Sequence, residues 1–252
     1  MRANKLHVLI VGASQGIGLG FVNHLLKDEN IAKIYATYRQ QETANGLLKQ
    51  VHNYPQKLVC LPVDITNESQ IVEAIDNISE QTEKLHLVIN CVGVLHNGEL
   101  QPEKSLRQIN AENLLHYFEV NSIPSILLAK HLLPLFKHQD RSVFACISAK
   151  VGSIGDNYLG GWYGYRASKA ALNMLMHNTA IEYRRKRLPT IVVTLHPGTT
   201  NTRLSQPFQR NVPPEKLFSV ERTVNQLLDV IAQLTPENSG EFFSWDGSRL
   251  PW

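Results

Sequence analysis

The sequence predicts a doubly wound α/β fold, in which helices cover both faces of a seven-stranded parallel sheet. Short apolar runs rich in β-branched residues alternate along the chain with longer segments of helical spacing. Strands joined by helical crossovers pair in parallel, and the sheet they form is buried on both faces. No repeat, low-complexity segment or Gly/Ser linker divides the chain, so we expect one domain over residues 1–252.

Seven short apolar runs have the length and composition of buried strands. They are residues 6–11, 33–38, 58–63, 87–91, 143–147, 191–195 and 241–244. Six longer segments repeat apolar residues three or four positions apart, which predicts helices. They are residues 17–27, 42–51, 68–82, 105–136, 160–187 and 220–234.

Charge and composition exclude several classes of function. The 25 basic and 22 acidic side chains give a net charge of +3 and are spread along the chain, whereas nucleic-acid binding needs clustered positive charge. The three cysteines lie in expected strands without metal-ligand spacing, so we expect neither a metal site nor a disulfide framework. The apolar runs are too short or too interrupted for a signal peptide or a membrane span, and we expect a cytoplasmic protein.

The first expected strand runs into a glycine-rich turn, residues 12–18, with the sequence GASQGIG. Glycines allow a tight turn and a close approach of the backbone to a pyrophosphate, and the following helix N-terminus supplies N–H groups and a positive dipole. A glycine cluster alone could be only a strand–helix turn. Its place after the first strand and before a helix is the one that a nucleotide site requires, so we expect such a site here.

The ends of the next strands bear on the choice of nucleotide. No Asp or Glu occupies residues 36–39, where an acidic residue would accept the ribose hydroxyls of NAD(H). Arg39 can instead pair with a 2′-phosphate, so we expect NADP(H) to be favoured over NAD(H). A solvated arginine after a strand is the simpler alternative. Residues 63–65 and 90–93 end the third and fourth strands and should lie at the same edge of the sheet.

Tyr165 and Lys169 are four residues apart in the expected helix 160–187, so their side chains share one face. A free tyrosine has a pKa of about 10, and a lysine charge held close should lower it and suit the pair to proton transfer. Tyr163 is less suitable, because Lys169 lies six residues further on. The spacing alone also fits an ordinary amphipathic helix with a lysine reaching to solvent.

Taken together, these motifs resemble the short-chain dehydrogenase/reductase family over nearly the whole chain. The likeness is greatest to C-factor-like and sniffer-like carbonyl reductases, through residues 152–154, 160–161, 165–172 and the ending 246–252. The resemblance implies a Rossmann domain that binds a nicotinamide dinucleotide. It assigns cofactor contacts to Gly12, Ser14, Gln15, Gly16, Ile17, Gly18, Arg39, Asp64, Ile65, Asn90, Gly93, Tyr165, Lys169, Pro197, Gly198 and Thr202.

The resemblance also implies a reaction, the reduction of an aldehyde or ketone to an alcohol by hydride transfer. In it Tyr165 donates the proton, while Lys169 holds the nicotinamide ribose and lowers the tyrosine pKa. A serine hydrogen-bonds the carbonyl oxygen as negative charge develops there. Asn121 kinks its helix and anchors a water that leads from Lys169 to solvent.

The chain departs from the family pattern at the serine. Counted from Gly152, the usual position falls on Ala149, with Ser148 one residue earlier. One step along a strand turns a side chain to the other face, so Ser148 can act only if the strand has ended or bulges there. We expect Ser148 to be the catalytic serine, with Ser153 as the alternative. A second departure is Gln15, where many NADP(H)-preferring members carry a basic residue.

A long proline-bearing segment, residues 199–218, predicts a substrate loop that covers the nicotinamide as a lid. The alternative is a surface connection with a short helix. Two other functions stay open: a non-catalytic NADP(H)-binding sensor or scaffold, and an NAD-dependent alcohol dehydrogenase of the same fold. As partners we expect a small carbonyl or alcohol substrate, no nucleic acid and no membrane. We also expect a homodimer or homotetramer through the helices 105–136 and 160–187, although their apolar faces could simply pack on the sheet.

Overall fold

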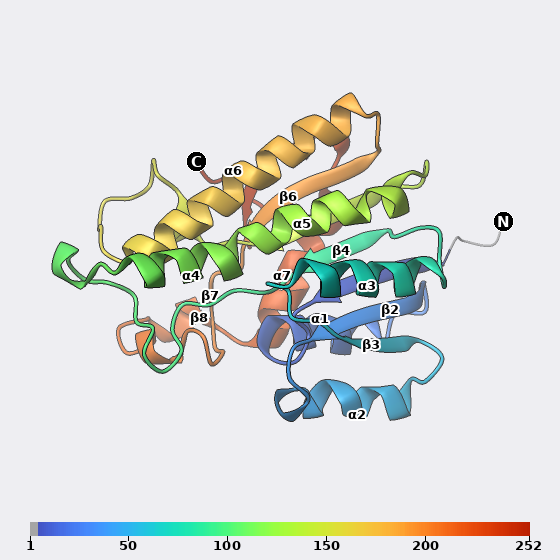
Figure 1. Cartoon of the computed structure of the whole chain (residues 1–252), viewed down its shortest axis with the longest axis horizontal. Coiled ribbons are helices and arrows are strands. Elements are labelled where there is room, and N and C mark those ends of the chain that lie inside the picture. The colour runs from blue at the N-terminus through green and yellow to red at the C-terminus, as the bar shows by residue number, and fades with distance from the viewer. Residues whose placement is uncertain (1–4) are drawn as a thin grey trace.

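The computed structural model describes residues 5–252 and contains the predicted seven-stranded parallel sheet (Figure 1). The strand order is β3-β2-β1-β4-β5-β6-β9, and a separate short pair joins β7 to β8. The sheet strands are β1 Leu6–Val11, β2 Ile31–Tyr38, β3 Leu58–Pro62, β4 Leu87–Asn90, β5 Ser142–Ile147, β6 Thr190–His196 and β9 Phe242–Ser244. The short strands are β7 Thr199–Thr200 and β8 Leu217–Phe218. The order reverses beside β1, so the segments that leave β1 and β4 meet at a switch point where such sheets bind ligands.

Helices cover both faces of the sheet, as predicted. They are α1 Gly16–Leu25, α2 Asn45–Asn53, α3 Glu68–Ser79, α4 Ala111–Asn121, α5 Ile123–Leu132, α6 Tyr163–Arg185 and α7 Val220–Gln233. One apolar core joins the sheet to α1, α2 and α7, and a second joins its other face to α3, α5 and α6. In Figure 1, α4 and α5 follow one another end to end, and α6 runs alongside them.

The alternation of side chains along β1 divides its residues between these two cores. Val8 and Ile10 belong to the core with α1 and α7, whereas Leu9 and Val11 belong to the core with α5 and α6. All four side chains are at most 1% exposed. Burial of this kind contributes roughly 1.5–3 kcal/mol for each large aliphatic side chain. A shift of one residue would exchange the two sets, so the register of this central strand is strongly determined.

Two helix predictions need correction. The predicted helix 105–136 begins only at Ala111 and is interrupted at Ser122, which has φ −122° and ψ −59°; α5 starts afresh at Ile123. Pro124 lies in the first turn of α5, where its missing N–H leaves no hydrogen bond unmade. The predicted helix 160–187 begins only at Tyr163, because Gly160, Gly161 and Trp162 all have positive φ.

Within the described residues, none of the helices has the length and apolar character needed to cross a membrane. The same residues contain no group of three or more His, Cys, Asp or Glu side chains placed to hold a metal ion. The three cysteines have free thiols.

Candidate active site

The glycine turn after β1 forms a cradle that fits a dinucleotide phosphate. Gly12 and Gly16 have φ values of +78° and +56°, which side-chain-bearing residues rarely adopt. A Cβ on Gly18 would lie 2.2 Å from the carbonyl oxygen of Gly12, so the turn closes only with glycine there. The cap residue of α1, Gln15, makes no side-chain hydrogen bond to the helix, and its first turn holds no acidic residue. The N–H groups at this helix start are therefore free to bind an anion.

The segment after β6 lies against this cradle. A Cβ on Gly16 would be 3.4 Å from the methyl carbon of Thr202, which places the predicted nicotinamide-side motif next to the glycine turn. Gly198 has φ +71° and leaves room for the Phe218 ring. Ser14, Ile17, Pro197 and Thr202 are partly exposed, whereas Gln15 is exposed.

One anchor of the glycine turn was missed from the sequence. The buried Thr37, near the end of β2, accepts a hydrogen bond from the Gly12 N–H on its hydroxyl at 3.0 Å. Its carbonyl oxygen accepts a second from the Ala13 N–H at 2.7 Å. A threonine in a strand looks like any β-branched residue in a sequence, so this role shows only in the structure. Arg39 lies exposed just beyond the same strand.

The predicted residues after β3 and β4 bond mainly within their own turns. The Asp64 carboxylate accepts from the N–H and hydroxyl of Thr66, at 3.0 and 2.7 Å. Ile65 is buried in the core with α3 and α5. The Asn90 amide donates to the Ser125 hydroxyl on α5 at 2.9 Å, and its oxygen accepts from the Val92 N–H at 3.0 Å. Asn90 thus fixes the loop of residues 90–93 to α5.

Lys169 and Tyr165 are both buried in the same part of α6. The Lys169 ammonium donates to the carbonyl oxygen of Ile147 at 3.0 Å and lies 5.9 Å from the centroid of the Tyr165 ring. Burial lowers the pKa of Lys169 to about 8, because the charged form loses its hydration. A Cβ on Gly93 would come within 3.3 Å of this ammonium, so the glycine makes room for it.

The expected effect of Lys169 on the tyrosine pKa is wrong for this structure. Burial raises the pKa of the Tyr165 phenol above its ordinary value. Burial withdraws the phenolate from water and so disfavours it. The Lys169 ammonium favours the phenolate less strongly, because it is turned toward the Ile147 carbonyl. The phenol therefore stays protonated at neutral pH, which suits a proton donor.

Asn121 connects the last turn of α4 to α6 and to the loop after β4. Its amide oxygen accepts from the Val94 N–H at 2.7 Å, and its amide nitrogen donates to the Val94 carbonyl at 2.9 Å and to the Ser168 hydroxyl at 3.0 Å. The Ser168 hydroxyl donates to the Tyr165 carbonyl at 2.8 Å, and the Ser122 hydroxyl donates to the Ser168 carbonyl at 2.7 Å. The break after α4 and these two serines together hold the tyrosine end of α6.

The structure does not turn the Ser148 hydroxyl toward Tyr165. β5 ends at Ile147, so the stated condition for Ser148 is met, yet the backbone stays extended beyond this end. The Ser148 N–H donates to the Leu195 carbonyl at 2.8 Å, which continues the β5–β6 ladder, and Ala149 is extended with φ −147° and ψ 142°. The Ser148 hydroxyl donates to the Asn173 side chain at 2.7 Å, and Asn173 follows Tyr165 by two helical turns, about 12 Å along α6.

Ala149 lies on the side of Tyr165. Its methyl group packs against an apolar cluster formed by Leu95, Leu100, Tyr117 and Tyr165. We call this group the tyrosine cluster. The alternative serine, Ser153, is buried and accepts a hydrogen bond from the Asp156 N–H at 3.1 Å in the following turn.

Aromatic side chains surround Tyr165 on the substrate side. The Trp162 ring lies 6.2 Å from Tyr165 and 4.9 Å from Phe208, both edge to face. The Tyr117 ring lies 6.2 Å from Tyr165, and its hydroxyl donates to the Leu95 carbonyl at 2.7 Å. Leu204 also packs on the tyrosine cluster. Two residues of the predicted substrate loop, Leu204 and Phe208, thus lie beside Tyr165.

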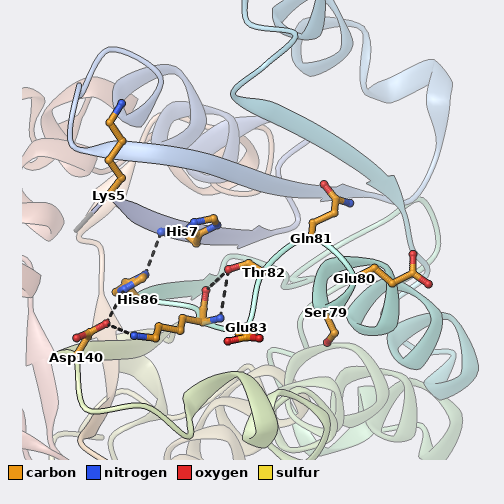
Figure 2. A pocket seen from close by; sticks show the side chains of 10 residues that line it. Lys5, His7, Ser79, Glu80, Gln81, Thr82, Glu83, His86 and Asp140 are labelled. Carbon is orange, nitrogen blue, oxygen red and sulfur yellow. Dashed lines mark hydrogen bonds and ion pairs between the residues drawn. The ribbon is translucent and has the colours of Figure 1, made fainter. Parts of the chain in front are cut away.

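A cavity of about 490 Å³ lies at the opposite edge of the sheet (Figure 2). His7, His86 and Asp140 line it, at or just before the starts of β1, β4 and β5, together with polar residues after α3. Figure 2 shows the His7 N–H bonded to His86, a bond of 3.1 Å. The Lys84 ammonium pairs with Asp140 at 2.9 Å. The cavity contains none of the predicted site residues, so we place the active site at the carboxyl edge.

Comparisons with known proteins agree with this architecture. A carbonyl reductase from chicken fatty liver, solved with NADPH bound, is 30% identical over the full length of both chains, with a TM-score of 0.87. The carbonyl reductase Sniffer of D. melanogaster is 25% identical over 98% of this chain and 99% of its own, with a TM-score of 0.86. A 1-hydroxy-2-glutathionyl-2-methyl-3-butene dehydrogenase from Rhodococcus sp. (strain AD45) is 31% identical, with 75% of this chain and 78% of the relative covered. The model of the short chain dehydrogenase family matches residues 6–213, and the chain therefore belongs to that family of oxidoreductases.

Proposed function

We propose that this protein reduces an aldehyde or ketone to an alcohol with NADP(H), and that Tyr165 donates the proton. The observation that carries the proposal is the buried pair of Tyr165 and Lys169 at the carboxyl edge of the sheet, where the glycine turn forms a phosphate cradle. The resemblance to carbonyl reductases, one of them solved with NADPH, supports both the reaction and the cofactor. When bound, the dinucleotide supplies a hydride to the substrate carbonyl.

In this proposal each residue has a separate task. The N–H groups at the start of α1 bind the phosphates, and Arg39, which is exposed beyond β2, pairs with the 2′-phosphate. Tyr165 is protonated at neutral pH because burial raises its pKa, and it releases its proton as negative charge develops on the substrate oxygen. The Lys169 ammonium, 5.9 Å from the ring centroid, then stabilises the phenolate. The loop 199–218 covers the substrate and excludes water, with Leu204 and Phe208 facing it.

The Tyr165→Phe variant tests the proposal. It keeps the ring and its packing but removes the proton, so we expect kcat for NADPH-dependent reduction to fall by about 10²–10⁴-fold. NADPH affinity, measured by quenching of tryptophan fluorescence, should change by less than about threefold. Undiminished turnover in this variant would remove Tyr165 from the role.

One observation favours a second candidate, a protein that binds NADP(H) without useful turnover. The Ser148 hydroxyl is bonded to Asn173, and Ala149 offers no hydroxyl to a substrate. Tight NADPH binding without oxidation by any of a panel of aldehydes, ketones and quinones would support this sensor. Comparing the affinities for NADPH and NADH, in the wild type and in Arg39→Ala, decides the cofactor preference.

We also propose that the protein forms a homodimer or homotetramer through α4 and α6. Leu115 on α4 and Met174 on α6 are 72% and 60% exposed, and Ile123 at the start of α5 is 46% exposed. Exposed apolar residues on adjacent helices favour a covered face. Sedimentation equilibrium of the wild type and of Leu115→Asp tests this, and a monomeric wild type would refute it.

A further inference from the structure

Position 149 combines two features that bear on which carbonyls the site can reduce. Ala149 continues the extended backbone of β5, and its methyl group packs on the tyrosine cluster. The preceding hydroxyl, of Ser148, is buried on the other side in a bond to Asn173. The backbone therefore turns the methyl group of Ala149 toward the tyrosine cluster. It turns the hydroxyl of Ser148, one residue earlier, away from this cluster.

The side chains of the tyrosine cluster and the apolar residues packed on it offer few donors to a substrate oxygen besides the indole N–H of Trp162. Among the described members of the tyrosine cluster, the hydroxyls belong to Tyr117 and Tyr165. The Tyr117 hydroxyl is bonded to the Leu95 carbonyl at 2.7 Å and is not free to turn to a ligand. The walls added by Ala149, Val151 and Leu204 are aliphatic. Tyr165 thus carries the hydroxyl of this cluster that remains for a substrate.

We infer that Ala149 is a specificity-determining residue, which restricts this enzyme to carbonyl groups already activated by an adjacent carbonyl. The inference rests on the proposed carbonyl reduction and deepens it. A second donor to a developing oxyanion typically contributes about 10²–10³ in kcat, and an unactivated ketone loses that factor here. A neighbouring carbonyl withdraws the charge that forms on the oxygen, so a 1,2-dicarbonyl depends less on the missing donor.

The aromatic walls favour a flat, conjugated form of this substrate. Trp162 and Phe208 meet edge to face at 4.9 Å beside Tyr165, and an aryl ring can stack against such faces. We therefore expect aryl 1,2-diketones. In the reaction, the carbonyl carbon accepts a hydride, the π electrons move to oxygen, and the oxygen takes the Tyr165 proton. The product is a hydroxyketone, NADPH is oxidised by two electrons, and solvent reprotonates the tyrosine.

Two substrates with one carbon skeleton test the inference. They are 1-phenylpropane-1,2-dione and propiophenone, which lacks the second carbonyl. Wild-type kcat/KM should be at least about 100-fold higher for the dione. Ala149→Ser should raise kcat/KM for propiophenone by about 100-fold and for the dione by less than about 10-fold, so that the ratio falls. Ala149→Cys has the size of the serine variant but only a weak donor, and it should leave the ratio unchanged.

A binding measurement gives a readout that does not require turnover. N-methylbenzamide carries an unreactive carbonyl oxygen, and one added hydrogen bond should tighten its binding to Ala149→Ser by about 2–10-fold relative to Ala149→Cys. Calorimetry with NADP⁺ present measures this. Thermal melting and NADPH affinity show whether each variant is folded.

Three results would overturn the inference. The first is a wild type that reduces propiophenone as efficiently as the dione. The second is a folded Ala149→Ser variant with an unchanged ratio and unchanged amide affinity. The third is a Ser153→Ala variant that binds NADPH normally but no longer reduces the dione, because Ser153 would then be a second donor. If the wild type binds NADPH and reduces neither compound, the proposed function fails, and the amide affinities still decide whether position 149 faces the carbonyl.

Discussion

Replacing Lys169 by methionine should abolish turnover and yet stabilise the fold. Lys169 is 3% exposed, its ammonium donates to one backbone carbonyl, and none of the ion pairs among the described residues includes it. Its pKa falls from 10.5 to about 8 on burial. At about 1.4 kcal/mol per pKa unit, this means that the charged lysine destabilises the folded state by on the order of 3 kcal/mol at pH 7. Methionine is of similar length and loses one hydrogen bond worth about 1 kcal/mol, so the net gain should be about 2 kcal/mol.

The gain should depend on pH in a defined direction. Below pH 8 the lysine is charged in both the folded and the unfolded state, and its full destabilisation is present. Between pH 8 and 10.5 only the unfolded state keeps the proton, so wild-type stability rises relative to the variant. The advantage of Lys169→Met should therefore disappear across this range.

Urea unfolding of the wild type and Lys169→Met at pH 7, 8, 9 and 10 measures this difference, and taking the difference cancels the titration of other groups. Lys27→Met, at an exposed position after α1, is the control for the substitution itself. A Lys169→Met variant less stable than the wild type at pH 7, or a difference that does not change with pH, would refute the reasoning.

Three further changes test other parts of the site. Gly18→Ala puts a Cβ 2.2 Å from the Gly12 carbonyl oxygen, so NADPH affinity, followed by fluorescence, should fall at least about 100-fold; wild-type affinity would show that the cradle is not the phosphate site. Asn121→Ala leaves the Val94 N–H and carbonyl without their partner, so the free energy of unfolding in urea should fall by about 2–3 kcal/mol. A fall below about 0.5 kcal/mol would contradict the role of Asn121 as a connector. Burial, with the nearby Lys150 charge, lowers the pKa of His196 to about 4. The free energy of unfolding of the wild type should therefore fall by on the order of 3 kcal/mol as the pH falls from 6.5 to 4, and that of His196→Gln should fall less. Parallel curves of unfolding free energy against pH for the two proteins would contradict this.

The fold could be predicted because its signals are local. Strand and helix periods differ, and each is visible within ten or so residues. The errors in the predicted helix bounds come from contacts between residues that are far apart in the sequence. The interruption at Ser122 depends on hydrogen bonds that Asn121 and Ser122 make with Ser168, 47 and 46 residues further on. The late start of α6 depends on the Glu103 carbonyl, which accepts from the Trp162 N–H and holds that residue in a left-handed conformation.

The site residues also divide into those with a local signal in the sequence and those whose roles depend on distant partners. The pairing of Tyr165 with Lys169 follows from a four-residue spacing and was predicted. Thr37 and Ser168 were missed, because their tasks depend on partners that only the fold brings near. The role of Ser148 stays a prediction, and the period of a strand already indicated that one of residues 148 and 149 faces away from Tyr165. The bond of the Ser148 hydroxyl to Asn173 and the packing of Ala149 on the tyrosine cluster show that it is the serine.

Burial explains both pKa shifts at the centre of this site, and the two shifts act together. A fold that withdraws Tyr165 and Lys169 from water raises the pKa of the phenol and lowers that of the ammonium, so each neutral form is favoured. A proton donor must hold its proton until charge develops on the substrate, and the raised pKa does this at neutral pH. The phenolate that remains then lies in a medium where the Lys169 charge acts more strongly than in water. The burial that destabilises Lys169 in the resting protein is therefore the same condition that makes it effective after the proton has moved. We therefore expect that a variant in which water reaches Tyr165 and Lys169 loses activity, while the pKa values of both groups return toward their ordinary values.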